Sequence, residues 1–127
     1  MISLDTETTG LDLHHGAKPY FATICDEDGG NQQWWEWDVD PLTREPVIPD
    51  TDLADIAEAT VLAGDDLVLQ NAKFDVAALH ATKYRFGTHW PWDKTRDTLI
   101  AGHLLASNQL HDLTSMALHY LGVDIQP

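Results

Sequence analysis

The chain begins with a short apolar strand that ends in two acids, one residue apart, and then a glycine. The segment reads Ile2-Ser3-Leu4-Asp5-Thr6-Glu7-Thr8-Thr9-Gly10. Side chains of an extended strand alternate between its two faces, so Asp5 and Glu7 project from the same side. Carboxylates this close repel each other unless a cation lies between them, and Mg²⁺ and Mn²⁺ prefer carboxylate oxygens. The pattern therefore leaves two interpretations: a divalent metal site, or an acidic strand end that faces solvent.

The rest of the hydrophobic pattern predicts an α/β domain in which helices flank a mixed β-sheet. After the first strand, residues 20–26 and 31–38 are expected to pair as a hairpin around the glycine-containing turn at 27–30. Short strands are expected at residues 67–70 and 95–96. Helices are expected over residues 50–64, 73–84, 97–106 and 112–122, where Asp97 is a good N-cap and Gly122 closes the last helix.

Length and composition exclude several classes of protein. The 127 residues suffice for one domain with its own core. No apolar stretch is long enough to span a membrane and no secretion signal is evident, so we expect no membrane partner. The single cysteine, Cys25, excludes an internal disulfide and indicates a cytoplasmic protein.

The chain is strongly acidic. Seven Lys and Arg residues stand against 21 Asp and Glu residues, which gives a formal net charge of -14. A surface of this charge repels nucleic acid at long range. A nucleic-acid partner must therefore be held by local contacts or through bound metal.

A second motif lies where a buried strand gives way to a helix, and it reads Asn71-Ala72-Lys73-Phe74-Asp75. Asp75 falls in the first helical turn, where free N–H groups and the helix dipole favour an anion. In open α/β sheets, ligand sites gather at the carboxyl ends of strands. If the first strand and the strand at 67–70 are parallel neighbours, Asp5, Glu7 and Asp75 converge on one point.

These two motifs resemble those of the DEDD 3′–5′ exonucleases, which have a ribonuclease H-like fold. Residues 5–10 look like the first motif of that family, and residues 71–75 look like the second. Residues 97–98, 111–113 and 117–122 are similar to a helical stretch of family A DNA polymerase proofreading domains and of the ribonuclease D group. The resemblance covers nearly the whole chain and favours the metal interpretation of the acidic pair.

The resemblance implies a two-metal-ion exonuclease that removes nucleotides from single-stranded or frayed 3′ ends of DNA, in viral or prokaryotic replication or repair. Two Mg²⁺ or Mn²⁺ ions would bind the scissile phosphate, one activating a water and the other stabilising the departing 3′ oxygen. Asp5 would bridge both ions, Glu7 would hold the ion of the nucleophile, and Asp75 would act on the second ion through water. Candidate contacts to the nucleic acid are Thr8, Asn71, Lys73 and Phe74.

The family also carries a fourth aspartate on a final helix, four residues after a tyrosine or histidine that orients the attacking water. The string from Tyr120 to Asp124 fits these letters, but Gly122 between them is expected to end the helix. Asp97 is another candidate, although its role as an N-cap is sufficient to explain it. We therefore expect residues 1–127 to be one exonuclease domain that is incomplete at its C-terminus.

Two alternatives to a DNA exonuclease stay open. The chain could be an RNA 3′-trimming enzyme of the ribonuclease D type. It could also be a non-catalytic fragment, or the partner-binding half of a split polymerase or exonuclease, with a polymerase domain in cis or in trans.

The five tryptophans have two interpretations as well. They could stack on the unpaired bases of a 3′ end, or they could be partly buried packing of the hairpin, which we favour. Trp34 is expected on the opposite face of its strand from Trp35 and Trp37. The two remaining tryptophans are Trp90 and Trp92.

Overall fold

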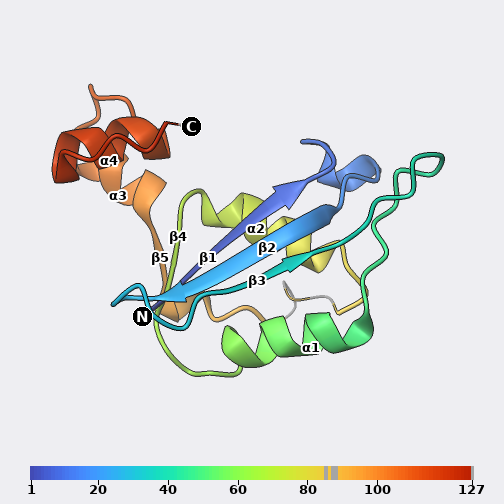
Figure 1. The fold of residues 1–127 in the computed structure, drawn as a ribbon. Helices are drawn as coiled ribbons and strands as arrows, with labels where there is room; N and C mark the ends of the chain where they lie inside the picture. The colour runs from blue at the N-terminus through green and yellow to red at the C-terminus, as the bar shows by residue number, and fades with distance from the viewer. Residues whose placement is uncertain (85, 87–88, 127) are drawn as a thin grey trace.

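The computed structural model describes residues 1–84, 86 and 89–126, which form a five-stranded mixed sheet with helices packed against it. The strands are β1 (Ile2–Thr8), β2 (Pro19–Asp26), β3 (Gln33–Glu36), β4 (Leu67–Leu69) and β5 (Thr95–Asp97). The helices are α1 (Asp50–Ala59), α2 (Ala72–His80), α3 (Thr98–Leu105) and α4 (Leu113–Leu121). The strands lie in the order β3-β2-β1-β4-β5 (Figure 1), which confirms the predicted α/β architecture.

β1 lies at the centre of the sheet, where the pairing changes direction. It runs antiparallel to β2, with Asp5 opposite Thr23, and parallel to β4, with Ile2 opposite Leu67. β2 and β3 form the expected hairpin, and β5 extends the parallel half. β4 has only three residues and pairs with β1 at Ile2 and Ser3, so the carboxyl half of β1 leaves that edge free. α2 follows directly after β4 and contacts this free edge.

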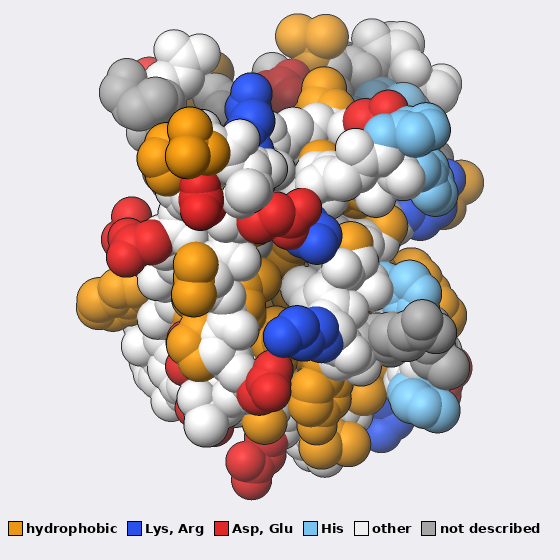
Figure 2. Space-filling view, turned by 90° about the vertical axis from the view of Figure 1, so that its right-hand side faces the viewer, with side chains coloured by type: hydrophobic (Ala, Val, Ile, Leu, Met, Phe, Trp, Pro, Cys, Tyr) orange, Lys and Arg blue, Asp and Glu red, His pale blue; other side chains and the backbone are white. Residues whose placement is uncertain are grey.

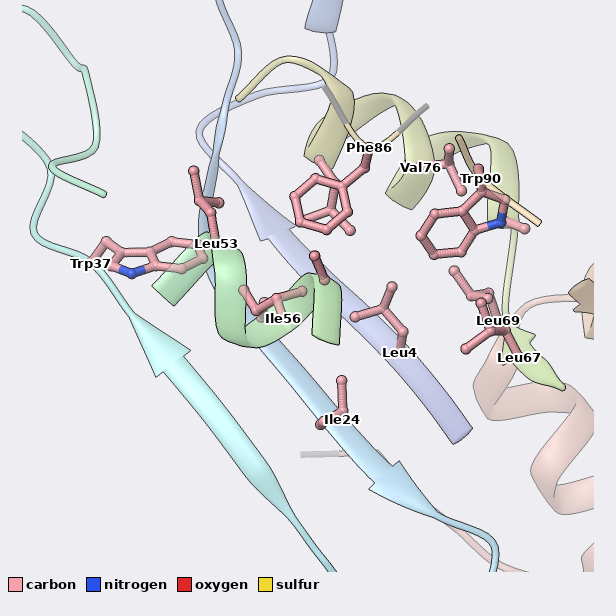
Figure 3. Close-up of a cluster of buried hydrophobic side chains, with 14 residues drawn as sticks. Leu4, Ile24, Trp37, Leu53, Ile56, Leu67, Leu69, Val76, Phe86 and Trp90 are labelled. Carbon is pink, nitrogen blue, oxygen red and sulfur yellow. The ribbon is translucent and has the colours of Figure 1, made fainter. Parts of the chain in front are cut away.

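One face of the sheet is buried beneath α1 and α2 (Figures 1 and 3). Leu4, Ile24 and Leu67 project from the strands into this layer; Ile56 of α1 lies near Leu4 and Ile24, and Leu67 lies beside Leu69 and Trp90. Each of these side chains is almost fully buried, and burial of one Leu or Ile contributes about 1.5–3 kcal/mol. This core fixes β1 firmly against the two helices.

The opposite face of the sheet is not covered by α1 or α2. Strand alternation and register place on it Ser3, Asp5 and Glu7 of β1, Phe21 and Thr23 of β2, and Trp34 and Glu36 of β3. We call this set the outer sheet face. A hollow of about 260 Å³ lies on it, with Asp5, Thr23, Val68 and Leu113 among its lining residues.

Most helix starts agree with the sequence signals, whereas some helix ends do not. The side chains of Asp97 and Asp112 each accept a hydrogen bond from a backbone N–H in the first turn of α3 and α4. Gly122 ends α4 in the left-handed region, with φ of 68°. α1 ends at Ala59 rather than near residue 64, because the backbone leaves the helical region at Thr60, with φ of -118° and ψ of -82°.

α3 and α4 lie together, apart from α1 and α2 (Figure 1). The buried His111 joins them: its Nε2 lies 2.7 Å from the carbonyl oxygen of Ala106, and its ring centroid lies 3.7 Å from that of His103. A Cβ at Gly102 would lie 3.0 Å from the His111 ring, a tight contact that a residue without a side chain avoids. Among the helices of the described residues, none has the length and apolar character needed to cross a membrane.

Candidate active site

The predicted pair Asp5 and Glu7 lies on the outer sheet face, as strand alternation requires. Both residues are exposed, so their carboxylates are open to solvent on one side. Partial burial raises the pKa of Asp5, and the neighbouring charge of Glu7 raises it further, while a hydrogen bond from the backbone of Thr6 lowers it. Repulsion between the two carboxylates favours the binding of a proton or a metal cation at this pair.

Asp75 reaches this pair from α2, across the free edge of β1. Its side chain is only 3% exposed. Thr6 donates both its backbone N–H, at 3.0 Å, and its hydroxyl, at 2.7 Å, to Oδ1 of Asp75. Thr6 can offer its N–H because β4 has already ended and leaves that edge of β1 unpaired. The early end of β4 therefore creates the place where the second motif meets the first.

The charge state of Asp75 reflects its burial. Burial raises the pKa of the carboxyl to about 7, and the charges of Asp5 and Asp97 raise it too, against the two hydrogen bonds from Thr6. Desolvation thus opposes the stabilisation of an anion that the helix N-terminus is expected to provide. A bound cation would favour the ionised form instead.

The three carboxylates do not form one closed cluster. Within residues 1–84, 86 and 89–126, no group of three or more His, Cys, Asp or Glu side chains lies close enough together to hold a metal. Asp5 is instead the shared member of two pairs, because its carboxyl interacts with the charge of Glu7 and with that of Asp75. Oδ2 of Asp75 has no hydrogen bond in the described part of the chain. The two pairs offer only carboxylate oxygens, which are the ligands that a hard divalent cation prefers.

Asp97 has a structural role at this junction. Its Oδ1 accepts from the backbone N–H groups of Asn71 and Leu99, at 3.0 and 2.9 Å, and its Oδ2 accepts from Ala72 at 2.8 Å. One carboxylate thus caps α3 and also the first residues of α2. This geometry confirms the predicted N-cap and extends it to a second helix.

The family of the chain follows from a comparison with family models. A model described as a 3′–5′ exonuclease, of the type found in family A DNA polymerases, matches residues 1–126. The chain belongs to this 3′–5′ exonuclease family. No curated protein matches it.

Solved structures resemble this exonuclease chain in fold. A nuclease in its apo form has a TM-score of 0.72 at 21% identity, with 98% of this chain and 53% of that chain covered. NrnC of Brucella melitensis, bound to pGG, has a TM-score of 0.69 at 21% identity, with 99% and 54% covered. The POL domain of Pol1 from M. smegmatis, in complex with DNA primer-template and dNTP, has a TM-score of 0.64 at 19% identity, with 98% and 19% covered. The fold is ribonuclease H-like, and the chain spans about half the length of the two nuclease chains.

The exonuclease residues predicted to contact nucleic acid surround the Asp75 junction. Asn71 and Lys73 are exposed and Phe74 is half-buried. Asn71 adopts a left-handed conformation, with φ of 64°, which turns the chain from β4 into α2. The hydroxyl of Thr8 donates to the carbonyl of Gly10 at 2.6 Å and so stabilises the turn after β1. Contact of these residues with a nucleic acid stays a prediction.

Tyr120 and Asp124 are not brought to the acidic residues by any contact within the described ranges. α4 ends at Leu121, so the two side chains share no helical face. Oδ1 of Asp124 accepts from the backbone N–H of Gln126 at 3.0 Å, and the Tyr120 ring packs edge-on to His119. The charges that raise the pKa of Asp75 come from Asp5 and Asp97. A role for Tyr120 and Asp124 in the exonuclease site stays a prediction.

Sequence reasoning overlooked three polar residues that hold the site. Thr6 anchors Asp75. The Thr98 hydroxyl donates to Oε1 of Gln70, whose Nε2 donates to the carbonyl of His111 at 2.7 Å, so the end of β4 is tied to α3 and to the start of α4. For Thr6 a signal existed: alternation puts it on the buried face, where a hydroxyl needs a partner. For Gln70 and Thr98 the nearby sequence gave no indication of these hydrogen bonds, because the partners are far apart along the chain.

The Thr6→Val substitution tests this anchor. Valine keeps the shape of threonine but removes the hydroxyl, so we expect a loss of about 1.5–3 kcal/mol in the free energy of unfolding near pH 8, where Asp75 is ionised. The loss should shrink near about pH 5, where Asp75 carries a proton. Urea unfolding at both pH values measures it, with Thr6→Ser as the matched control that keeps the hydroxyl. Equal losses at the two pH values would show that Thr6 acts only through packing.

Proposed function

We propose that the protein is a two-metal-ion 3′–5′ exonuclease that removes nucleotides from 3′ ends of DNA, as in proofreading. The observation that carries this proposal is the Thr6–Asp75 junction, which brings the acid of α2 to Asp5 on β1. Family membership supports the reaction type. The all-carboxylate donor set supports Mg²⁺ or Mn²⁺ as the cofactor.

Each acid has a distinct role in this proposal. Asp5, Glu7 and Asp75 would hold the cations, which when bound stabilise charge on the phosphate and lower the pKa of a coordinated water. Asp5 is shared between the two carboxylate pairs, so it is the residue whose loss affects both. Thr6 occupies Oδ1 of Asp75 and leaves Oδ2 available. Asp75 must give up a proton to bind a cation, so metal affinity should increase as the pH rises through about 7.

RNA is the second candidate substrate. It is favoured by the likeness to NrnC bound to pGG, whereas the likeness to a polymerase domain with a DNA primer-template favours DNA. Nothing in the acidic site selects between the two sugars. The same assay must therefore include both polymers.

The exonuclease activity could also depend on a polymerase or nuclease segment that binds to this chain. The chain spans about half the length of its nuclease neighbours. α3 and α4 also expose several leucines, namely Leu104, Leu105, Leu118 and Leu121. In this form of the proposal, the chain alone binds metal, but it reaches full activity only in a complex with a polymerase or nuclease segment.

The test is trimming of 5′-labelled single-stranded DNA and RNA in Mn²⁺ or Mg²⁺, resolved on denaturing gels. We expect shortening from the 3′ end, abolished by chelator and reduced at least about 100-fold by Asp5→Asn or Glu7→Gln. Asp28→Asn, in the exposed hairpin turn, removes the same charge as Asp5→Asn and should leave the rate unchanged. Internal cleavage, or an Asp5→Asn variant as active as the parent, would contradict the proposal.

A further inference from the structure

The structure separates the tryptophans by their surroundings. Trp37 and Trp90 are 4% and 5% exposed, and their indole N–H groups donate to Asp52 at 2.9 Å and to Thr95 at 2.8 Å. The packing interpretation is therefore confirmed for these two. Trp34 differs, because 66% of it is exposed and its indole makes no hydrogen bond or ring contact in the described part of the chain. Packing does not explain why an indole stands at this position.

The sheet register places Trp34 in line with the acidic site. Asp5 of β1 lies opposite Thr23 of β2, and Thr23 lies opposite Trp34 of β3. Directly opposed residues point to the same face, so all three belong to the outer sheet face. Two strand spacings separate the backbones of Asp5 and Trp34, a distance of about 10 Å. Thr23 has a small side chain and lines the hollow together with Asp5 and Leu113, so the residue between Trp34 and Asp5 in the strand register is a short one.

We infer that Trp34 is a stacking platform for an unpaired nucleobase of the substrate strand, next to the nucleotide held at Asp5. This inference rests on the proposed exonuclease function and assigns one contact between the protein and its substrate strand. An exposed indole offers a flat π-face, and stacking on an aromatic side chain contributes about 1–3 kcal/mol per base with little sequence preference. A base paired within a duplex does not offer its face in this way.

The charge of the protein favours a contact that does not depend on phosphates. The outer sheet face carries Glu7 and Glu36 beside Asp5, and the end of the molecule at which β1 finishes shows acidic side chains interspersed with Lys and Arg (Figure 2). This is not the continuous basic groove that usually follows a nucleic-acid backbone. Stacking and cation-mediated contacts must then supply the affinity that phosphate contacts supply elsewhere.

The test is a double-mutant cycle between Trp34 and the base. The probe is a short fluorescein-labelled oligothymidylate whose 3′ linkages are phosphorothioates to slow cleavage, compared with the same strand carrying abasic nucleotides at its 3′ end. Binding is followed by anisotropy in Mg²⁺. For the parent protein we expect about 5- to 100-fold weaker binding of the abasic strand. For Trp34→Ala we expect a similar loss with the normal strand and little further loss with the abasic one.

Two variants serve as controls for this cycle. Trp34→Phe keeps an aromatic face and should retain most of the affinity. Trp92→Ala removes another exposed tryptophan, 51% exposed and outside the outer sheet face, and should bind as the parent does. Thermal unfolding checks that each variant is folded.

Each other outcome has a separate meaning. If the parent binds the strand and Trp34→Ala binds it equally well, the stacking inference is wrong and the exonuclease proposal stands. If the parent binds neither strand in Mg²⁺ or Mn²⁺, both the stacking inference and an exonuclease that acts without a partner segment are wrong. If the parent is a dimer that Trp34→Ala dissociates, the outer sheet face is an interface between copies and stacking is wrong.

Discussion

The Asp75→Asn variant is expected to lose metal-dependent trimming of 3′ ends and, at the same time, to be more stable than the parent near pH 8. Asparagine is the same size as aspartate, and its side-chain oxygen can accept the two hydrogen bonds that Thr6 donates. It removes a buried negative charge that lies near Asp5 and Asp97. Activity and stability should therefore change in opposite directions.

The sign of the stability change follows from the pKa of Asp75, which rises from 3.8 to about 7 on folding. Well below about pH 4 the carboxyl is protonated in the folded and the unfolded state, so its ionisation does not change the free energy of unfolding. Between about pH 4 and 7 the unfolded state ionises first, so the folded state loses stability as the pH rises, by up to about 4 kcal/mol. Asp75→Asn should lack this decline.

Urea unfolding from about pH 4 to 8, without divalent metal, measures this difference. The parent should lose stability across that range and Asp75→Asn should lose less. Mn²⁺ should restore stability to the parent near pH 8 and do little for the variant. An Asp75→Asn variant that is less stable than the parent near pH 8 would show that Asp75 is ionised and well paired in the folded chain.

Asp97→Ala is expected to cause the largest loss of stability of any single change at this site. The Asp97 carboxylate accepts from the N–H groups of Asn71, Ala72 and Leu99, and the N–H of Ala72 belongs to a buried residue. Loss of an N-cap costs about 0.5–2 kcal/mol, and each hydrogen bond to a charged group contributes about 1.5–3 kcal/mol. We expect a loss of about 3 kcal/mol or more.

Two further substitutions at position 97 separate the stability that Asp97 contributes to α3 from the stability that it contributes to α2. Asp97→Asn keeps one acceptor oxygen, and Asp97→Ser can cap α3 but is too short to serve α2 as well. Urea unfolding should therefore rank the stabilities as the parent, then Asp97→Asn, then Asp97→Ser, then Asp97→Ala. If Asp97→Ala were as stable as the parent, the three hydrogen bonds to Asp97 would contribute nothing and the capping role would be wrong.

The features that could be predicted from sequence depend on neighbours close along the chain. Alternation fixes that Asp5 and Glu7 share a face, and Asp97 caps the helix that begins directly after it. These predictions are confirmed. The end of α1 was predicted too late, since the backbone leaves the helical region at Thr60, before the chain reaches Gly64.

The features that could not be predicted depend on how distant segments meet. The pKa of Asp75 is set by burial against β1, which requires that β4 end early enough to leave the N–H of Thr6 free. The helix dipole alone suggested the opposite sign. The position of Trp34 likewise requires the register of three strands, although alternation correctly separates it from Trp35.

Mn²⁺ binding measured by calorimetry near pH 8 tests the shared role of Asp5 most directly. The parent should bind Mn²⁺, Glu7→Gln and Asp75→Asn should each bind it more weakly, and Asp5→Asn should lose binding, because Asp5 belongs to both carboxylate pairs. Asp28→Asn controls for the general attraction of a chain with a net charge of -14. If the Asp5→Asn variant binds Mn²⁺ with the same affinity as the parent, the cation site is not centred on β1 and the account is wrong.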